Sequence, residues 1–215
     1  MAFVKAANGV YELYGQMESR GNKMKTYFDE SSHTYDGTQL RSLYTYLKFG
    51  ILGDSVVAWA GPCKVNPTHM VDGEDLRAGE KIQGDSMLHF IVEVFDRDLA
   101  FMVAMQRIFA SLIEEELEKI FQTNINRSGD DLFWGDGKLS ISIATQSPVS
   151  SLLHFAVNLS NRGTPVKTAS IEDLAMIDGK NHHLPIKDLA NRFMSRFSSE
   201  YESILIATQK VKWVN

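Results

Sequence analysis

Three segments of the chain alternate apolar and polar side chains with a period of two, the pattern of β-strands that bury one face. These segments are residues 87–95, 138–144 and 152–159. In each of them one face carries branched or aromatic residues, and the opposite face carries small or reactive polar residues. The apolar faces need a covering layer, and they therefore constrain the chain to a sheet with helices packed against it.

Apolar residues at helical spacing predict that covering layer. Helices are expected over residues 38–52, over 97–121 with Asp96 as N-cap, over 170–176 with Ser170 as N-cap, and over 185–207. A further strand is expected over residues 55–60, and residues 124–131 are expected to form a polar turn. Residues 1–30 are expected to be peripheral, and Ser147-Pro148 to lie in a hairpin turn. This order predicts an α+β fold, an antiparallel or mixed sheet flanked by helices, in a single domain over residues 1–215.

Composition excludes several classes of function. The formal net charge of −5 argues against a nucleic-acid-binding surface, which is usually basic. Cys63 is the only cysteine, so an intrachain disulfide and a multi-cysteine metal site are both excluded. No other spacing constitutes a metal motif, and no segment has the length or the apolar character of a membrane span or a signal peptide. We therefore expect a cytoplasmic protein with a small-molecule substrate, no membrane or nucleic-acid partner, and a possible homodimer.

The polar faces of the three strands contain residues suited to chemistry. They carry His89 and Glu93 on the first strand, His154, Ala156 and Asn158 on the last, and Lys138, Ser140, Ser142 and Ala144 on the middle one. One interpretation is a concave floor of a binding site; the other is a solvated sheet face, which antiparallel sheets commonly have. Two histidines with Ser, Asn and Ala are unusual on a solvated face, and this favours the first interpretation.

The loop around residue 74 is a second candidate. Glu74 and Asp75 can accept hydrogen bonds from the N–H groups of a guanine-like base, and Arg77 can pair with a carboxylate. The same residues also fit the N-terminus of an ordinary helix, where acids are common in the first turn. The sequence leaves these two interpretations open.

A motif in the middle of the chain resembles the biotin and lipoate protein ligases. Asp130-Asp131-Leu132, Lys138-Leu139-Ser140 and Ala156-Val157-Asn158 match successive parts of the ligase signature. In those ligases the lysine contacts the carboxylate that is activated, so the resemblance implies an anion-binding role for Lys138. As a whole, with GTQLRS, MVDGEDLRAG and DDLFWGDGKLSISIAT, the chain resembles the domain of unknown function 366 family, which is grouped with the class II synthetase and biotin/lipoate ligase superfamily and has been linked to 7-deazaguanine metabolism.

The chain departs from the ligase pattern at several positions. Ile141 stands where the ligases have a glycine that lets the backbone approach a ligand. No Gly/Arg-rich loop precedes His89, and Asp130 replaces an asparagine. These departures favour chemistry without ATP on a carboxylate.

We therefore expect an ATP-independent enzyme, a lyase that acts on a carboxylated purine-like molecule, such as a decarboxylase of 7-carboxy-7-deazaguanine. Lys138 would orient the carboxylate, Asp131 or Glu93 would hold the base edge, and His89 or His154 would protonate the ring carbon. Ser140, Ser142, Asn158 and the loop residues Glu74, Asp75 and Arg77 complete the expected substrate site. No cofactor is expected. The alternatives are an ATP-dependent ligase, which would need ATP and Mg²⁺, and a non-catalytic binding module.

Overall fold

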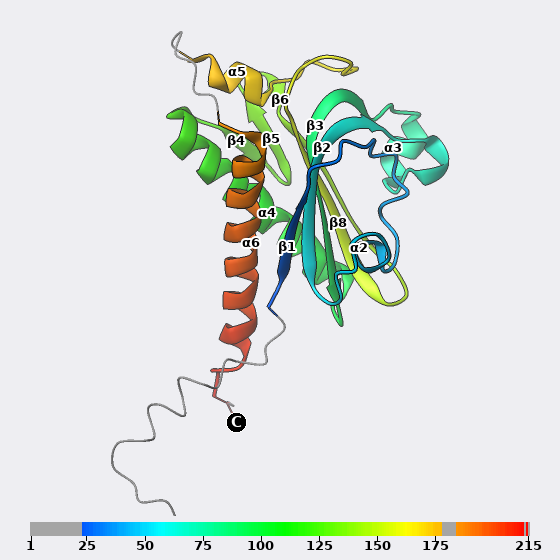
Figure 1. The fold of residues 1–215 in the computed structure, drawn as a ribbon, viewed down its shortest axis with the longest axis vertical. Helices are drawn as coiled ribbons and strands as arrows, with labels where there is room; N and C mark the ends of the chain where they lie inside the picture. The colour runs from blue at the N-terminus through cyan, green and yellow to red at the C-terminus, as the bar shows by residue number, and fades with distance from the viewer. Residues whose placement is uncertain (1–22, 178–183, 213, 215) are drawn as a thin grey trace, which may run out of the picture.

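The computed structural model of this protein describes residues 23–177, 184–212 and 214. Its centre is a five-stranded mixed sheet (Figure 1). The strands are β1 (Lys25–Asp29), β2 (Ser55–Lys64), β3 (Gln83–Phe95), β7 (Ser140–Gln146) and β8 (Ser150–Asn158). Their order is β1-β2-β3-β8-β7, with β1 parallel to β2 and all other pairs antiparallel.

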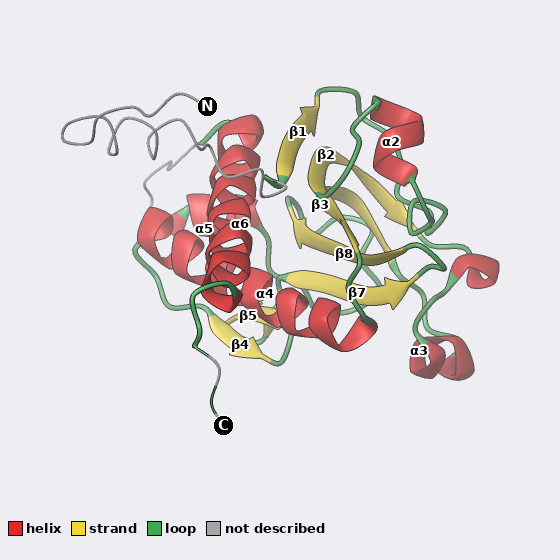
Figure 2. Ribbon diagram, turned by 90° about the horizontal axis from the view of Figure 1, so that it is seen from below, coloured by secondary structure: helices red, strands yellow, loops and turns green. Residues whose placement is uncertain are grey.

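Helices lie on both sides of this sheet, and a second, smaller sheet adjoins it. The helices are α2 (Tyr44–Phe49), the 3-10 turn η1 (Pro67–His69), α3 (Gly73–Ala78), α4 (Leu99–Phe121), α5 (Ile171–Ala175) and α6 (Ile186–Thr208). The small sheet has the order β4 (Asn126–Ser128), β5 (Asp131–Trp134), β6 (Gly137–Lys138). Figure 2 shows α4, α5 and α6 on one side of the main sheet and α2 and α3 on the other.

The main hydrophobic core lies between the sheet and the two long helices. It includes the phenylalanines of β3, β8, α4 and α6, which pack edge-on or tilted: Phe90, Phe109, Phe155, Phe193 and Phe197. Phe90 and Phe155 come from the apolar strand faces predicted by the period of two, and the other three come from the helices that cover those faces. The predicted α+β fold, a mixed sheet flanked by helices, is confirmed.

The opposite face of the sheet holds a smaller cluster, which includes Tyr35, Trp59, Ile91 and Ala156. This face is covered only by short helices and by loops, so it leaves space for a pocket. The candidate binding site therefore lies on this side of the sheet. Among the helices of the described residues, none is long and apolar enough to cross a membrane.

Several boundaries predicted from sequence are confirmed. The strand predicted over 87–95 lies within β3, and the strand over 152–159 agrees with β8 to within two residues. Ser170 caps α5 in a reciprocal capping box with Asp173. The helix predicted over 185–207 is α6, displaced by one residue. Ser147-Pro148 lies in the turn between β7 and β8.

The helix predicted over residues 38–52 is wrong. Only Tyr44–Phe49 is helical, and Leu43 before it has a left-handed backbone with φ of 60°. The Leu43 N–H donates to the buried carboxylate of Glu93 over 2.6 Å. A contact between residues distant in sequence therefore sets where this helix begins.

Other predicted boundaries also need correction. Asp98, not Asp96, caps α4: its carboxylate accepts from the Phe101 N–H over 2.8 Å, whereas Asp96 has a positive φ of 56°. β2 continues through Gly61-Pro62 because the ladder shifts register there. The predicted polar turn over 124–131 contains β4 and the first residue of β5, and residues 25–29 of the segment predicted to be peripheral form β1.

The strand predicted over 138–144 is divided at Leu139, and this changes its faces. Lys138 ends β6 in the small sheet, whereas β7 begins at Ser140. In the ladder with β8, Ile141 pairs with Ala156 and Ile143 with His154, so the isoleucines share the pocket face. The predicted polar face of Ser140, Ser142 and Ala144 instead lies on the side of α4, where Gln106 Nε2 donates to Ser142 Oγ over 2.8 Å, and of these three residues only Ser142 also borders the pocket.

Candidate functional site

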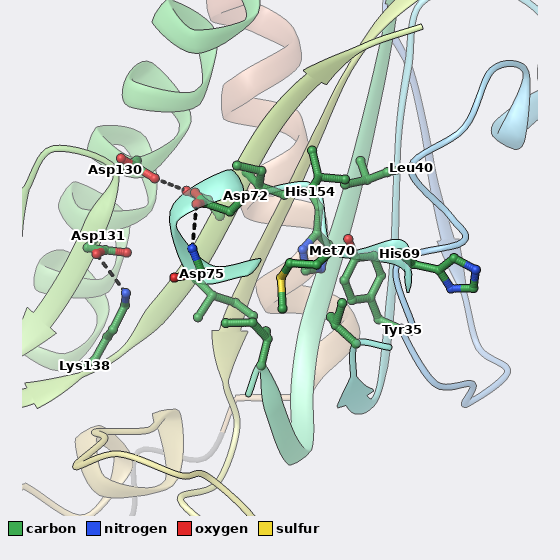
Figure 3. A pocket seen from close by; sticks show the side chains of 16 residues that line it. Tyr35, Leu40, His69, Met70, Asp72, Asp75, Asp130, Asp131, Lys138 and His154 are labelled. Carbon is green, nitrogen blue, oxygen red and sulfur yellow. Dashed lines mark hydrogen bonds and ion pairs between the residues drawn. The ribbon is translucent and has the colours of Figure 1, made fainter. Parts of the chain in front are cut away.

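A pocket of about 280 Å³ opens on the side of the sheet away from α4 and α6. This volume is near the lower end for small-molecule sites, roughly 300 Å³. Figure 3 shows Lys138, Asp130 and Asp131 on one side of the pocket, Tyr35 and His69 on the other, and His154 between them. The apolar part of the wall includes Leu40, Met70, Val71, Ile82, Ile141 and Ile143.

An ion pair forms one wall of the pocket. The Lys138 Nζ lies 2.8 Å from Asp131 Oδ2, and each side chain is about one-third exposed, 33% and 31%. The backbone of Lys138 is fixed as well, because Asn158 Nδ2 donates to its carbonyl oxygen over 3.0 Å. Lys138 is the one lysine or arginine among the pocket-lining residues that the structure describes. It therefore supplies the positive charge of the site.

The second acid of the motif, Asp130, is held by a different network. Its Oδ2 accepts hydrogen bonds from Gln106 Nε2 over 2.7 Å and from Ser142 Oγ over 2.6 Å. Arg107 on α4 lies 3.4 Å from its other oxygen. Both carboxylate oxygens of Asp130 therefore have protein partners. Ser142, which borders the pocket, donates its hydroxyl hydrogen to Asp130.

Asp72 and Asp75 face the Lys138 side from α3. Asp72 is the N-cap of that helix, and its carboxylate accepts from the N–H groups of Glu74 and Asp75. The Asp75 carboxylate makes no hydrogen bond or ion pair within the described part of the chain. Burial, with Asp72 and other acids nearby, raises the pKa of Asp75, while Lys138 acts in the opposite direction. Asp75 is therefore an acceptor that a ligand can use.

The floor of the pocket is formed by a pair of histidines. His154 lines the pocket, and His89 lies behind it with its Nδ1 3.1 Å from His154 Nε2. The Tyr35 ring stacks on His154 at 3.5 Å between centroids. Burial lowers the pKa of His89 to about 3 and, with His89 adjacent, lowers the pKa of His154 well below its ordinary value. The structure brings the two predicted histidines together, but both are neutral imidazoles near pH 7, which argues against the predicted role of general acid.

Glu93 does not line the pocket. It is fully buried near α2, where it accepts from Leu43 N, from the Thr45 hydroxyl over 3.2 Å and from the Ser150 hydroxyl over 2.8 Å. Each of these contacts is a structural one. The geometry corrects the prediction that Glu93 acts on the substrate.

Other predicted site residues also have structural partners. Ser140 is fully buried, and its hydroxyl accepts from the Leu132 N–H over 2.9 Å. Asn158 is buried and donates to the carbonyl groups of Lys138 and Ala169.

Glu74 and Arg77 are exposed on α3 and do not line the pocket, unlike Asp75.

Several lining residues were not predicted from sequence. Tyr35 and Met70 lie in loops, where no periodicity marks a side chain as buried. Asp72 lies two residues before Glu74 and Asp130 directly precedes Asp131, so the acidic character of both segments could have indicated these two residues. His69 borders the pocket from the 3-10 turn η1.

The buried histidine pair makes stability depend on pH. The pKa of His89 is about 3 in the folded chain and near 6.5 in the unfolded chain. Between these two pH values His89 is protonated in the unfolded chain and neutral in the folded chain. Its contribution is fully present above pH 6.5 and is lost as the pH falls towards 3. Lowering the pH from 7.5 to 5 should therefore reduce the free energy of unfolding by about 2 kcal/mol through His89 alone. Urea unfolding at both pH values measures this, and His89→Asn is the matched variant; an equal loss of stability in wild type and variant would contradict the assignment.

Solved structures with the same fold include biotin protein ligases. The biotin protein ligase from Aquifex aeolicus in complex with biotin and ATP aligns with a TM-score of 0.54 at 12% identity, covering 83% of this chain and 70% of the ligase. The enzyme from Leishmania major in complex with biotin aligns with a TM-score of 0.55 at 13% identity, covering 89% and 84%. The fold is thus biotin protein ligase-like, as the sequence motif predicted.

The chain belongs to the family described as domain of unknown function (DUF366), whose model matches residues 24–212. The solved structure of a protein of unknown function from Pyrococcus horikoshi is 35% identical in sequence, with a TM-score of 0.82, and the alignment covers 89% of this chain and 100% of that one. An uncharacterized protein of Methanocaldococcus jannaschii is 30% identical over 161 residues, 72% of each chain. The family predicted from sequence is therefore confirmed.

Proposed function

We propose that this protein is an ATP-independent enzyme that removes a carboxylate from a purine-like base, with 7-carboxy-7-deazaguanine as the candidate substrate and 7-deazaguanine as the product. The observation that carries the proposal is the Lys138–Asp131 ion pair, 2.8 Å long, on the wall of a small pocket whose other charged lining groups are acidic. The family that the chain resembles has been linked to 7-deazaguanine metabolism, and this link points to the same class of molecule.

The acidic groups suit recognition of a guanine-like edge. That edge presents a ring N–H and an amino group, both of which donate, and a free carboxylate accepts from both. Asp75 is the acceptor available for this contact, because Asp130 and Asp72 are already bonded to protein groups. Apolar walls formed by residues such as Met70 and Ile141 fit the two faces of a flat ring.

Lys138 is the group proposed to carry out the chemistry. Its ammonium orients the substrate carboxylate and donates a proton to the ring carbon that bears it. The electron pair of the breaking C–C bond then restores the aromatic ring, and the carboxylate leaves as CO₂. Solvent returns the proton to Lys138, and the ion pair with Asp131 holds the lysine in place. Loss of neutral CO₂ also relieves the repulsion between the substrate carboxylate and the surrounding aspartates.

The same charges disfavour ATP as a co-substrate. A triphosphate is normally held by several cations or by backbone N–H groups. Four aspartates line this pocket against one lysine. Ile141 places a branched side chain on the pocket face where the resembling ligases have a glycine.

A direct assay tests the proposal. Purified protein is incubated with 7-carboxy-7-deazaguanine in heavy water without ATP, and the base is followed by mass spectrometry. We expect a product lighter by CO₂ that carries one carbon-bound deuterium at the position vacated by the carboxylate. Product formation only with Mg-ATP and pyrophosphate release would instead establish the ligase alternative, and saturable binding without product would establish a binding module.

A further inference from the structure

A chain of three polar groups runs from the bulged strand β2 to the pocket. His89 Nε2 lies 3.1 Å from the carbonyl oxygen of Gly61, and His89 Nδ1 lies 3.1 Å from His154 Nε2. His154 is the member that reaches the pocket wall. Each link has the length of an ordinary hydrogen bond.

Donor and acceptor roles along this chain follow from its first member. A carbonyl oxygen only accepts, so the Nε2 of His89 must carry the hydrogen. In a neutral imidazole the other nitrogen then accepts, and His89 Nδ1 must receive a hydrogen from His154 Nε2. His154 Nδ1 is left without a hydrogen, and within the described part of the chain nothing donates to it. Both rings are neutral near pH 7, because burial holds their pKa values low.

The surroundings keep both rings in this arrangement. Tyr35 stacks on His154 with an interplanar angle of 7°, and Trp59 stacks on His89 at 5.2 Å between centroids. Gly61 is needed for the first link, because a Cβ at this position would collide with the carbonyl oxygen of His33. The Trp59 indole N–H donates to that same carbonyl over 2.9 Å. His154, which is buried at the pocket wall, is thus held as a hydrogen-bond acceptor.

We propose that His154 Nδ1 accepts the five-membered-ring N–H of the substrate, and that the enzyme therefore acts on the free base and rejects its N-substituted forms, including the nucleoside. This inference rests on the proposed function and adds the substrate form. In a 7-deazaguanine the nitrogen of the five-membered ring is conjugated, through one double bond, to the carbon that bears the carboxylate. Accepting its N–H therefore raises the electron density at the carbon that must take up the proton. His154 contacts the substrate, and His89 is a positioning residue that sets the tautomer.

Two measurements on the wild-type protein test this. Nitrogen-15 NMR of the histidine rings, without ligand, should show both His89 and His154 as neutral Nε2–H tautomers at pH 7. Turnover should then be compared between 7-carboxy-7-deazaguanine and the analogue methylated on the five-membered-ring nitrogen. We expect the methylated analogue to be at least thirtyfold slower in kcat/KM.

A pair of variants separates tautomer control from packing. His89→Asn keeps an acceptor near the position of Nδ1 and should stay within threefold of wild-type kcat/KM. His89→Leu removes that acceptor and should lower kcat/KM at least tenfold, with the His154 signals shifting to a mixture of tautomers. Equal losses in both variants would mean a packing role only and would overturn the proposal.

The other outcomes are also distinct. Equal turnover of the two substrates would overturn the inference and leave the decarboxylase intact. A His154 ring that carries its hydrogen on Nδ1 would overturn the inference whatever the activity. The expected tautomers with no turnover of the free base would overturn the proposed function and, with it, the role of His154 in substrate choice.

Discussion

Replacing Lys138 with alanine is expected to lower kcat/KM for 7-carboxy-7-deazaguanine at least a hundredfold, with little effect on folding. The ammonium of Lys138 is the one lysine or arginine charge on the described pocket wall, and in the proposed reaction it both orients the carboxylate and supplies the proton. Loss of a general acid alone commonly costs 10²–10⁴-fold. The side chain is one-third exposed, so its removal leaves no buried cavity.

Lys167→Ala is the matched control. Lys167 also forms an ion pair, with Asp136 at 3.3 Å, but both side chains are exposed, 73% and 89%, and neither lines the pocket. Its removal should leave kcat/KM within twofold of wild type, because exposed ion pairs contribute little. Lys138→Arg keeps the charge but not the shape, and we expect activity between those of wild type and Lys138→Ala. Steady-state kinetics on the four proteins decides the matter: a Lys138→Ala enzyme within threefold of wild type would remove Lys138 from the chemistry.

Regular elements with a buried apolar face were the most predictable part of the fold. β3 and β8 follow from alternation, and α6 follows from a stripe that includes Leu189, Phe193 and Phe197. β1 was not predictable in this way, because three of its five residues are exposed and its pattern does not alternate. The start of α2 depends on a contact with Glu93, fifty residues away in sequence, which no local pattern contains.

The site was predictable in its strand residues and not in its loop residues. Alternation placed His89 and His154 on one face of the sheet, and their 3.1 Å contact confirms that part of the hypothesis. The break at Leu139 reversed the faces of the next strand, because Lys138 belongs to the small sheet and Ser140 bonds to Leu132. Tyr35 was missed because it lies in a loop. Tertiary packing places a loop side chain, and local sequence periodicity carries no information about that packing.

Glu93 provides the other large expected effect, and it separates structure from catalysis. Its buried carboxylate accepts from Leu43 N, Thr45 Oγ1 and Ser150 Oγ, so it joins the start of α2 to the start of β8. In Glu93→Gln one acceptor oxygen becomes a donor that faces other donors, and we expect a loss of about 3 kcal/mol in the free energy of unfolding. Urea unfolding at pH 7.5 measures this loss.

Glu200→Gln, on the exposed surface of α6, should change the same free energy by less than about 0.5 kcal/mol. The kcat of the folded Glu93→Gln fraction should remain within threefold of wild type, because Glu93 does not reach the pocket. A stable Glu93→Gln protein with kcat reduced tenfold or more would instead return Glu93 to the reaction. In that case α2 would have to move and open a path from the pocket to this carboxylate, since Thr45 and Leu43 now enclose it.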